Sequence, residues 1–326
     1  MANFAIVGAT GVVGTKMIER LEESNLQVDN IYLMASSKSA GKILKFRGKQ
    51  VIVEELNEHS FDKDIDYALF SAGGSTSKKF APIAEKHGVI VIDNSSAWRM
   101  DPQIDLVVPE CNKPMLNRKI IANPNCSTIQ SVVPLKPIHE TFGLKRITYT
   151  TYQAVSGSGI GGINDLKNGQ EGIEPQKYPH PIYNNVLPHI DDFLENGYTK
   201  EEMKMINETK KILSLDDNVQ ITATCVRVPV FNSHSVEIDI SLEKPASVDG
   251  IRQILENAPG VVLIDKPQNN QYPMPLNATG QDKVLVGRIR KDISQENSFH
   301  IWCVADNIRK GAASNAVQIA EMLENK

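Results

Sequence analysis

Short apolar runs and amphipathic stretches alternate along the first third of the chain. Residues 4–7 form a continuous apolar run that ends at Gly8, which is typical of a strand buried on both faces of a parallel sheet. Residues 14–23 then place apolar side chains on one side of a predicted helix and charged ones elsewhere. The same reasoning predicts strands at 31–35, 51–54, 66–70, 89–92, 105–108 and 119–122, and a helix at 81–87. Strands that alternate with helices indicate βαβ units, so we expect an α/β fold with an N-terminal, Rossmann-type doubly wound parallel sheet.

The pattern of polar and apolar positions changes after that region. Residues 145–155 and 219–242 predict longer strands, and apolar residues within 236–242 alternate with Glu, Asp and Ser. Such alternation is typical of a sheet with one buried and one polar face, which is usually antiparallel or mixed. Residues 175–189 are rich in Pro, His, Asn and Tyr and predict an extended loop, while 312–323 predict a C-terminal helix. We therefore expect a second domain of α+β type built on a mixed sheet.

Composition narrows the class of protein further. The 326 residues are 41% hydrophobic and 23% charged, which excludes wholesale disorder and suggests two domains, with three as an alternative. A formal net charge of -4 argues against a polybasic nucleic-acid-binding protein. The longest uncharged run, 147–164, is full of polar residues and glycine, so no membrane span is predicted. Because the N-terminus lacks the features of a signal peptide, we expect a cytoplasmic protein that binds neither nucleic acid nor membrane.

A glycine-rich loop follows the first predicted strand and opens the first predicted helix. Gly8, Gly11 and Gly14 have the spacing Gly-x-x-Gly-x-x-Gly. Glycines allow a sharp turn and a close approach of a pyrophosphate to the backbone, and the helix N-terminus offers N–H groups and a positive dipole end. The spacing alone also fits a plain tight turn. The strand-turn-helix context favours dinucleotide binding.

The segment after the second predicted strand bears on the choice of dinucleotide. An NAD-preferring loop typically carries Asp or Glu here to bind the ribose hydroxyls. Residues 36–41 instead supply hydroxyls and Lys38, with no carboxylate, which suits a 2′-phosphate. We therefore expect NADP as the cofactor. The alternative for Lys38 is a solvated loop lysine.

Four cysteines, at 111, 126, 225 and 303, are too sparse for a disulfide scaffold and form no Cys-x-x-Cys pair. Cys225 and Cys303 lie in apolar, strand-like runs and, like Cys111, fit a structural role. Cys126 has polar, turn-forming neighbours and precedes an apolar helical stretch. At a helix N-terminus a cysteine gains thiolate character, and the same N–H groups can hold an oxyanion. Cys126 is therefore the candidate nucleophile, and no metal site is predicted.

Seven segments in order resemble the aspartate-β-semialdehyde dehydrogenase family, from the N-terminus to the C-terminal helix. They are residues 8–14, 94–99, 123–128, 152–157, 200–204, 227–230 with His234, and 306–311. The resemblance implies NADPH-dependent reductive dephosphorylation of 4-phospho-L-aspartate to L-aspartate 4-semialdehyde through a cysteine thioester. It places the chain in the biosynthesis of lysine (through diaminopimelate), threonine and methionine, and implies a homodimer.

The resemblance assigns three catalytic residues. Cys126 attacks the acyl phosphate, expels phosphate and carries the thioester, which splits one difficult step into two easier ones. His234 is the acid/base and Gln153 orients the substrate. From the residues alone, His234 also fits a polar turn between strands, and Gln153 fits a polar strand end.

The resemblance also assigns residues to the charged groups of the substrate. Arg227 binds the α-carboxylate, a role suited to the planar donor fork of arginine. Arg99 and Lys204 receive the phosphate, Glu201 faces the ammonium, and Asn125 joins the substrate site. Glu201 and Lys204 are three residues apart and share a helix face, so a solvated surface pair is the alternative.

The remaining assignments concern the cofactor and the domains. By resemblance, the cofactor is lined by Thr10, Gly11, Val12, Val13, Lys38, Ser39, Ser156, Gly157 and Asn307, beside Gly8 and Gly14. Because Asn307 lies near the C-terminus, we expect residues 1–125 plus 307–326 to form the NADP-binding domain. Residues 126–306 then form the catalytic and dimerisation domain.

Two other classes compete with this interpretation. N-acetyl-glutamyl-phosphate reductases and glyceraldehyde-phosphate dehydrogenases share the nucleotide domain, a cysteine and a histidine. The Ser-Cys-Thr-Thr-Asn pattern of the latter is absent here. A non-catalytic homologue that binds nucleotide or a partner without turnover is the other alternative, and the presence of Cys126 argues against it.

Overall fold

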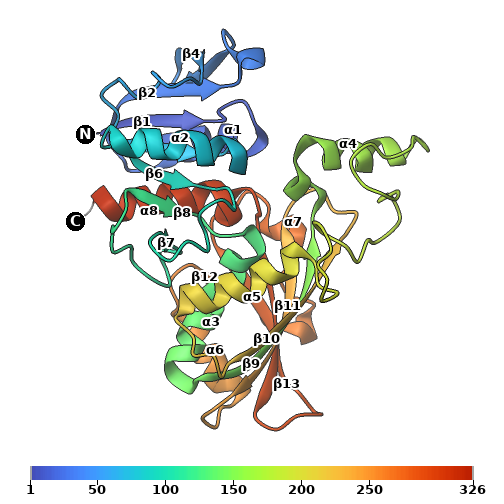
Figure 1. The fold of residues 1–326 in the computed structure, drawn as a ribbon. Helices are drawn as coiled ribbons and strands as arrows, with labels where there is room; N and C mark the ends of the chain where they lie inside the picture. The colour runs from blue at the N-terminus through green and yellow to red at the C-terminus, as the bar shows by residue number, and fades with distance from the viewer. Residues whose placement is uncertain (1, 325–326) are drawn as a thin grey trace. The chain divides into compact units, whose positions relative to one another are not determined.

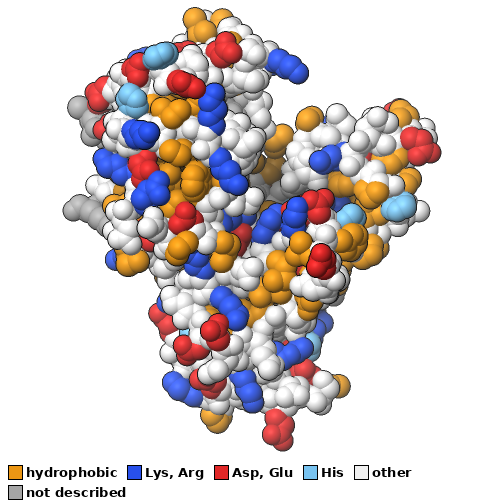
Figure 2. All heavy atoms as spheres, viewed as in Figure 1, with side chains coloured by type: hydrophobic (Ala, Val, Ile, Leu, Met, Phe, Trp, Pro, Cys, Tyr) orange, Lys and Arg blue, Asp and Glu red, His pale blue; other side chains and the backbone are white. Residues whose placement is uncertain are grey.

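The computed structural model describes residues 2–324 and divides into two compact units. The first unit comprises residues 1–125 and 312–326, and the second comprises residues 126–311. Residues 307–311, expected in the nucleotide domain, thus group with the second unit. In Figure 2, basic and acidic side chains intermix over the visible surface of each unit. Within residues 2–324, no helix combines the length and apolar character that a membrane crossing requires.

An eight-stranded sheet forms the centre of the first unit, in the order β3-β4-β2-β1-β5-β6-β8-β7 (Figure 1). All neighbouring strands are parallel except β3 and β4, which form an antiparallel hairpin. This arrangement confirms the predicted doubly wound parallel sheet. The elements of this unit are β1 (Ala2–Val7), α1 (Val12–Glu23), β2 (Val28–Ala35), η1 (Ser37–Ser39), β3 (Ile43–Phe46), β4 (Lys49–Glu55), β5 (Tyr67–Phe70), α2 (Gly74–Lys86), β6 (Ile90–Asp93), β7 (Asp105–Leu106), β8 (Ile120–Ala122) and α8 (Ser314–Glu324).

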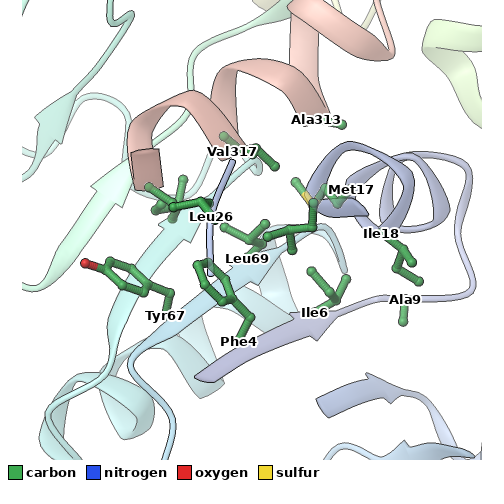
Figure 3. Packing of buried hydrophobic residues seen from close by; sticks show 14 of the residues in the cluster. Phe4, Ile6, Ala9, Met17, Ile18, Leu26, Tyr67, Leu69, Ala313 and Val317 are labelled. Carbon is green, nitrogen blue, oxygen red and sulfur yellow. The ribbon is translucent and has the colours of Figure 1, made fainter. Parts of the chain in front are cut away.

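The core of the first unit joins its N-terminal strand to its C-terminal helix. β1 is buried along its whole length, as its continuous apolar run predicted. Phe4 stacks on Tyr67 with ring centroids 5.1 Å apart. Figure 3 shows Val317 of α8 in the same cluster as Phe4, Met17 and Leu69. The C-terminal helix is therefore part of the hydrophobic core beside β1.

Two elements of the first unit differ from the predicted ranges. The helix predicted at 81–87 is the second half of α2, whose first residues are mostly Gly, Ser, Thr and Lys and give no apolar signal. The strand predicted at 105–108 ends at Leu106. The Asn112 side chain donates to the Leu106 carbonyl and accepts from the Val108 N–H, so it takes main-chain groups that could extend the strand pairing.

The second unit contains a six-stranded sheet in the order β10-β9-β11-β14-β13-β12. β10 with β9 and β12 with β13 are parallel, and the other pairs are antiparallel, which confirms the predicted mixed sheet. Its elements are α3 (Cys126–Phe142), β9 (Leu144–Gln153), η2 (Val155–Ser158), α4 (Gly159–Gly169), α5 (Lys200–Leu213), β10 (Gln220–Arg227), β11 (His234–Leu242), α6 (Val248–Glu256), β12 (Val261–Leu263), η3 (Pro267–Asn269), α7 (Pro275–Ala278), β13 (Val284–Lys291), β14 (Ser298–Ala305) and η4 (Arg309–Ala313), whose last residues belong to the first unit.

The single stretch predicted at 219–242 is two strands. Residues 228–233 separate β10 from β11, contain Pro229, and end at Ser233 in the left-handed region (φ 72°). Proline cannot donate to a strand ladder, and a positive φ breaks extended geometry. The break places Arg227 at the end of one strand and His234 at the start of the next.

Candidate active site

Cys126 is the first residue of α3 in the second unit. Its side chain is half-buried, whereas the other three cysteines are buried, and all four are thiols. Burial raises the pKa of Cys303 to about 12 and that of Cys225 well above its ordinary value, so neither supplies a thiolate near neutral pH. The helix N-terminus therefore presents the one cysteine of the four that is partly accessible.

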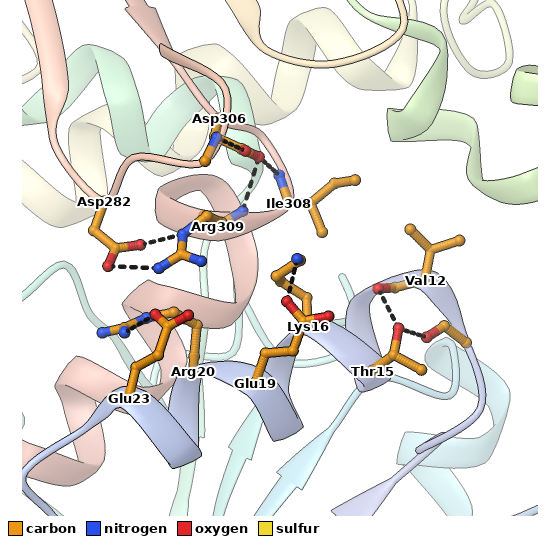
Figure 4. Close-up of polar contacts among 12 residues, drawn as sticks. Val12, Thr15, Lys16, Glu19, Arg20, Glu23, Asp282, Asp306, Ile308 and Arg309 are labelled. Atoms are coloured by element: carbon orange, nitrogen blue, oxygen red, sulfur yellow. Dashed lines mark hydrogen bonds and ion pairs between the residues drawn. The ribbon is translucent and has the colours of Figure 1, made fainter. Parts of the chain in front are cut away.

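A close contact with a glycine fixes the surroundings of Cys126. A Cβ added at Gly311 would lie 2.8 Å from the Cys126 Cβ, so only glycine fits here without displacement. Gly311 is in η4, a π-helical turn, where its N–H donates to the Asp306 carbonyl. Asp306 also accepts the N–H groups of Ile308 and Arg309, and the Arg309 guanidinium is paired with Asp282 (Figure 4). These bonds hold the turn that packs on the cysteine.

His234 is fully buried, and its hydrogen bonds define its proton positions. The Ala154 N–H donates to Nδ1 at 3.0 Å, so Nδ1 is an acceptor. Burial, with a smaller contribution from the Arg227 charge, holds the pKa of His234 well below its ordinary value. The neutral ring therefore carries its proton on Nε2, which is buried and has no hydrogen-bond partner among the described residues.

Gln130 links the nucleophile helix to the histidine. It lies one turn after Cys126 on α3, is fully buried, and donates to the His234 carbonyl at 3.0 Å. It also donates to the Cys303 carbonyl at 3.4 Å. Sequence reasoning missed this residue, although an amide inside an apolar helical run was a visible signal.

Arg227 lies beside the same turn as His234. It is only 5% exposed, and its Nη1 donates to the Ala154 carbonyl at 2.7 Å. A Cβ at Gly157 would lie 3.1 Å from Arg227 Nη1 and 3.2 Å from His234 Nε2. Arg227 Nε is buried without a hydrogen-bond partner in the part of the chain that the structure describes. The turn at 154–157 thus lies beside two buried donors, His234 Nε2 and Arg227 Nε, that have no acceptor within residues 2–324.

Gln153, Glu201 and Lys204 form a connected polar chain. Gln153 Nε2 donates to Glu201 Oε1 at 3.2 Å, and Lys204 Nζ lies 3.1 Å from Glu201 Oε2. Glu201 is 5% exposed, so the pair on α5 is not a solvated surface pair. The start of α5 is fixed by a capping box between Thr199 and Glu202.

Asp191 is a further member of that polar chain, and no motif or local pattern in the sequence predicts its role. Its carboxylate lies 2.7 Å from Lys204 Nζ, and its backbone is left-handed (φ 68°). Burial by itself would lower the pKa of Lys204. The Glu201 and Asp191 carboxylates outweigh this effect and raise the pKa of Lys204 above its ordinary value. Lys204 therefore remains an ammonium between two carboxylates.

Ser156 and Asn307 are hydrogen bonded to each other in the second unit. Asn307 Nδ2 donates to Ser156 Oγ at 3.0 Å, and Asn307 Oδ1 accepts the Ser233 N–H at 2.9 Å. Asn307 therefore joins the turn that contains Gly157 to the residue before His234. Both residues were predicted to line the cofactor.

The other predicted substrate residues are in the first unit. Arg99 is buried, and its guanidinium donates to the carbonyls of Asn123 and Asn94 at 3.0 and 2.9 Å. Asn125 is buried and ends the first segment of this unit. Main-chain acceptors thus fix the position of the Arg99 guanidinium.

The glycine loop has the geometry that a dinucleotide phosphate requires. Gly8 has a φ of 86°, and a Cβ there would lie 2.9 Å from the Ser71 backbone. A Cβ at Gly14 would lie 2.1 Å from the Gly8 carbonyl oxygen. Gly11 is the N-cap of α1 and supplies no side-chain hydrogen bond, so first-turn N–H groups are available for an anion. The residues present therefore fit a bound dinucleotide.

The remaining cofactor candidates of the first unit lie in this loop, at the start of α1 or in the segment after β2. Thr10 Oγ1 donates to Ser39 Oγ at 3.2 Å, which ties the glycine loop to the segment after β2. Val12 and Val13 begin α1, and Lys38 is exposed in η1. This exposure fits a Lys38 that binds a 2′-phosphate, and it also fits the alternative of a solvated loop lysine.

Comparisons with known proteins agree with one another. The family model described as semialdehyde dehydrogenase, NAD binding domain, matches residues 3–118, and the semialdehyde dehydrogenase dimerisation domain matches residues 135–310. An aspartate-semialdehyde dehydrogenase of Aquifex aeolicus is 58% identical, over 98% of this chain and 97% of the relative. The crystal structure of aspartate semialdehyde dehydrogenase II complexed with ASA from Vibrio cholerae is similar, with a TM-score of 0.95 and 45% identity over 100% of this chain and 99% of that chain. An aspartate semialdehyde dehydrogenase with NADP from Candida albicans has a TM-score of 0.79 and 26% identity over 99% and 98% of the two chains.

Proposed function

The chain belongs to the aspartate-semialdehyde dehydrogenase family, and from that premise we propose how its own residues carry the family reaction. The reaction is the NADPH-dependent reductive dephosphorylation of 4-phospho-L-aspartate to L-aspartate 4-semialdehyde, in amino-acid biosynthesis. The observation that carries the proposal is that His234 Nε2 and Arg227 Nε are buried without a partner among the described residues, in the unit where Cys126 begins α3. Such donors call for acceptors on a bound substrate.

Cys126 is the nucleophile in this proposal. Its thiolate attacks the acyl carbon, the carbonyl oxygen takes the negative charge, and phosphate leaves with the electrons of the C–O bond to give a thioester. When bound, NADPH supplies the hydride that reduces the acyl group. His234 Nε2–H donates to the oxygen that becomes negative. Release of the aldehyde returns the Cys126 thiolate.

The charged side chains recognise the substrate. Arg227 binds the α-carboxylate, and its Nε is buried without a hydrogen-bond partner among the described residues. Glu201 receives the ammonium, with Gln153 bonded to the same carboxylate, and Lys204 receives the phosphate. By resemblance to the family, Arg99 is also assigned to the phosphate and Asn125 to the substrate.

An acylated amino group would not use this arrangement. N-acetyl-glutamyl phosphate has no ammonium. With that substrate bound, the buried Glu201 carboxylate would lack the cation that the ammonium of the aspartyl substrate supplies. N-acetyl-glutamyl-phosphate reductase activity is therefore not favoured. The test is NADPH formation by the purified protein with phosphate, NADP⁺ and either aldehyde. We expect turnover with L-aspartate 4-semialdehyde, and turnover only with N-acetyl-glutamate semialdehyde would contradict the proposal.

We further propose that Gly8, Gly11 and Gly14 hold the pyrophosphate of NADP. Lys38 and Ser39 lie on η1 for the 2′-phosphate, Thr10 joins the two loops, and Val12 and Val13 flank the site. By resemblance to the family, Ser156, Gly157 and Asn307 are also assigned to the cofactor. The relative from Candida albicans is described with NADP, which supports this choice. Equal kcat/KM values for NADP⁺ and NAD⁺ would contradict it.

We also propose a homodimer in the cytoplasm. The match of residues 135–310 to a dimerisation domain supports assembly through the second unit. Four cysteines present as thiols suit a reducing compartment. Sedimentation velocity at micromolar concentration tests the dimer, and a single species with the mass of one chain would contradict it.

A further inference from the structure

The segment that follows α4 lies over the end of β10. Leu187 and Arg227 exchange two main-chain hydrogen bonds, at 2.9 and 2.8 Å, so this segment adds an isolated bridge to the strand that carries Arg227. Its apolar side chains, Ile182 and Leu187, pack with Val155. Residues 175–189 form no helix or strand, in keeping with the predicted extended loop, and Ile182 and Leu187 anchor this loop near Arg227. The proposed function gives the loop no role.

Tyr178 brings an aromatic ring to the Arg227 guanidinium. The Arg227 Cζ lies 5.9 Å from the centroid of the Tyr178 ring, within the range of a cation–π contact. The ring is half-buried, and the phenol donates to Ser158 Oγ at 3.0 Å. Burial raises the pKa of Tyr178 although the Arg227 charge opposes this, so the phenol stays neutral at the guanidinium.

Two features of α4 fix the position of this ring. The buried Asp165 carboxylate accepts the N–H groups of Gln176, Lys177 and Tyr178 at 2.9, 2.8 and 2.9 Å. A Cβ at Gly162 would lie 2.5 Å from the Tyr178 hydroxyl, so glycine leaves the room that the phenol occupies. The ring is thus held by hydrogen bonds on one side and by shape on the other.

The guanidinium is therefore held between Tyr178 and the turn at 154–157. Arg227 Nη1 donates to the Ala154 carbonyl, and Nε has no acceptor in the described structure. An aromatic face restricts the orientation of the guanidinium plane without consuming an N–H donor. A carboxylate needs two donors in one plane, so a fixed plane favours bidentate binding.

We propose that Tyr178 is a positioning residue that orients Arg227 and thereby makes the site select substrates with an α-carboxylate. The proposal rests on the proposed function, since it takes Arg227 as the carboxylate-binding group. It is separable from that function, because turnover of the aldehyde can be measured independently of selectivity.

The experiment compares two aldehydes in the reverse assay with phosphate and NADP⁺. L-Aspartate 4-semialdehyde carries the α-carboxylate, and 3-aminopropanal is the same molecule with hydrogen in its place. Tyr178→Leu removes the ring, Tyr178→Met fills its volume without an aromatic face, and Tyr178→Phe keeps the ring without the hydroxyl. Tyr183→Leu is the matched control, because its ring lies on the same segment and is 45% exposed.

For Tyr178→Leu and Tyr178→Met we expect the ratio of kcat/KM for the two aldehydes to fall about tenfold, through KM of the natural aldehyde. Tyr178→Phe and Tyr183→Leu should keep the ratio, and KM for NADP⁺ should stay constant in all variants. In an Arg227→Lys background, Tyr178→Met should change the ratio little further. Equal losses with both aldehydes, or a fall in kcat alone, would overturn the proposal. Absence of wild-type turnover with either aldehyde would instead refute the proposed function.

Discussion

His234 shows how one main-chain contact determines what a side chain can do. The Ala154 N–H bonded to Nδ1 leaves Nε2 as the donor end, so the buried neutral ring can donate a hydrogen bond but has no free lone pair there. In the proposed mechanism this is the end that stabilises the oxygen of the intermediate. A role as general base in the resting site would need the opposite tautomer.

This proton position predicts different effects of two substitutions at residue 234. A glutamine can donate through its amide and cannot act as a base, while methionine can do neither. We expect His234→Met to lower kcat about 10²–10³-fold, the usual cost of losing one oxyanion donor, and His234→Gln to lower it less. Steady-state kinetics at pH 8 measure both. Equal losses in the two variants would show that donation from this position is not the main contribution.

The same burial predicts a pH dependence of stability. Because the folded-state pKa of His234 lies well below its ordinary value, near 6.5, the unfolded chain binds a proton below about pH 6.5 that the folded chain does not. The free energy of unfolding should therefore fall as pH drops below that value, by up to about 1.4 kcal/mol per pH unit for this one group. Urea unfolding at pH 7.5 and 5.5 tests this. His234→Gln should reduce the difference in unfolding free energy between the two pH values. The remaining difference comes from other groups, such as the partly buried His139, whose pKa is also lowered by burial.

At the scale of elements, η4 and α3 meet at one glycine. Gly311→Ala would place a Cβ 2.8 Å from the Cys126 Cβ, which forces either the π-turn or the helix start to shift. We expect at least a tenfold loss of kcat, since small displacements of a reacting group are costly, and slower alkylation of Cys126 by iodoacetamide. Gly74→Ala is the control, because its added Cβ would meet only the Ala97 Cβ at 3.9 Å. An unchanged Gly311→Ala enzyme would remove this positioning argument.

Elements with a distinct pattern of apolar residues or glycines in their own segment could be predicted from the sequence. The buried run at 4–7 and the glycine loop were sufficient for β1 and the start of α1, since burial on both faces and a strand-to-helix turn leave direct marks in the sequence. β13 was not predicted, because a register shift between Gly287 and Arg290, with Arg288 at a φ of 52°, breaks the alternation of its side chains.

The same distinction applies to the candidate site: some of its residues have a local sequence signal, and others are brought in by contacts between distant segments. The position of Cys126 at a helix start could be read from its polar neighbours and the apolar stretch that follows. The contacts of Gln130 with His234 and of Asp191 with Lys204 join residues far apart in the chain, so no local pattern contains them. The resemblance to a family supplied the residue roles, and the structure supplied these additional partners.

At the scale of the whole molecule, the chain leaves its first unit and returns to it. α8 places Val317 and Ile319 in the hydrophobic core that also contains Phe4. Ile319→Ala should therefore destabilise the first unit by about 2–5 kcal/mol, the usual cost of this change in a core. Glu321→Ala, on the same helix and partly exposed, should cost less than about 0.5 kcal/mol. Thermal unfolding monitored by circular dichroism compares them, and equal shifts would contradict the placement of Ile319.

The proposed mechanism depends above all on a covalent bond to Cys126. Intact-protein mass spectrometry after mixing with 4-phospho-L-aspartate, without NADPH, detects it directly. We predict an aspartyl adduct on the wild-type chain, release of one phosphate per adduct, and peptide mapping of the adduct to Cys126. Cys126→Ala should form no adduct while still binding NADP⁺. Reduction of the substrate by Cys126→Ala at the wild-type rate, or an adduct that maps to another residue, would contradict the mechanism.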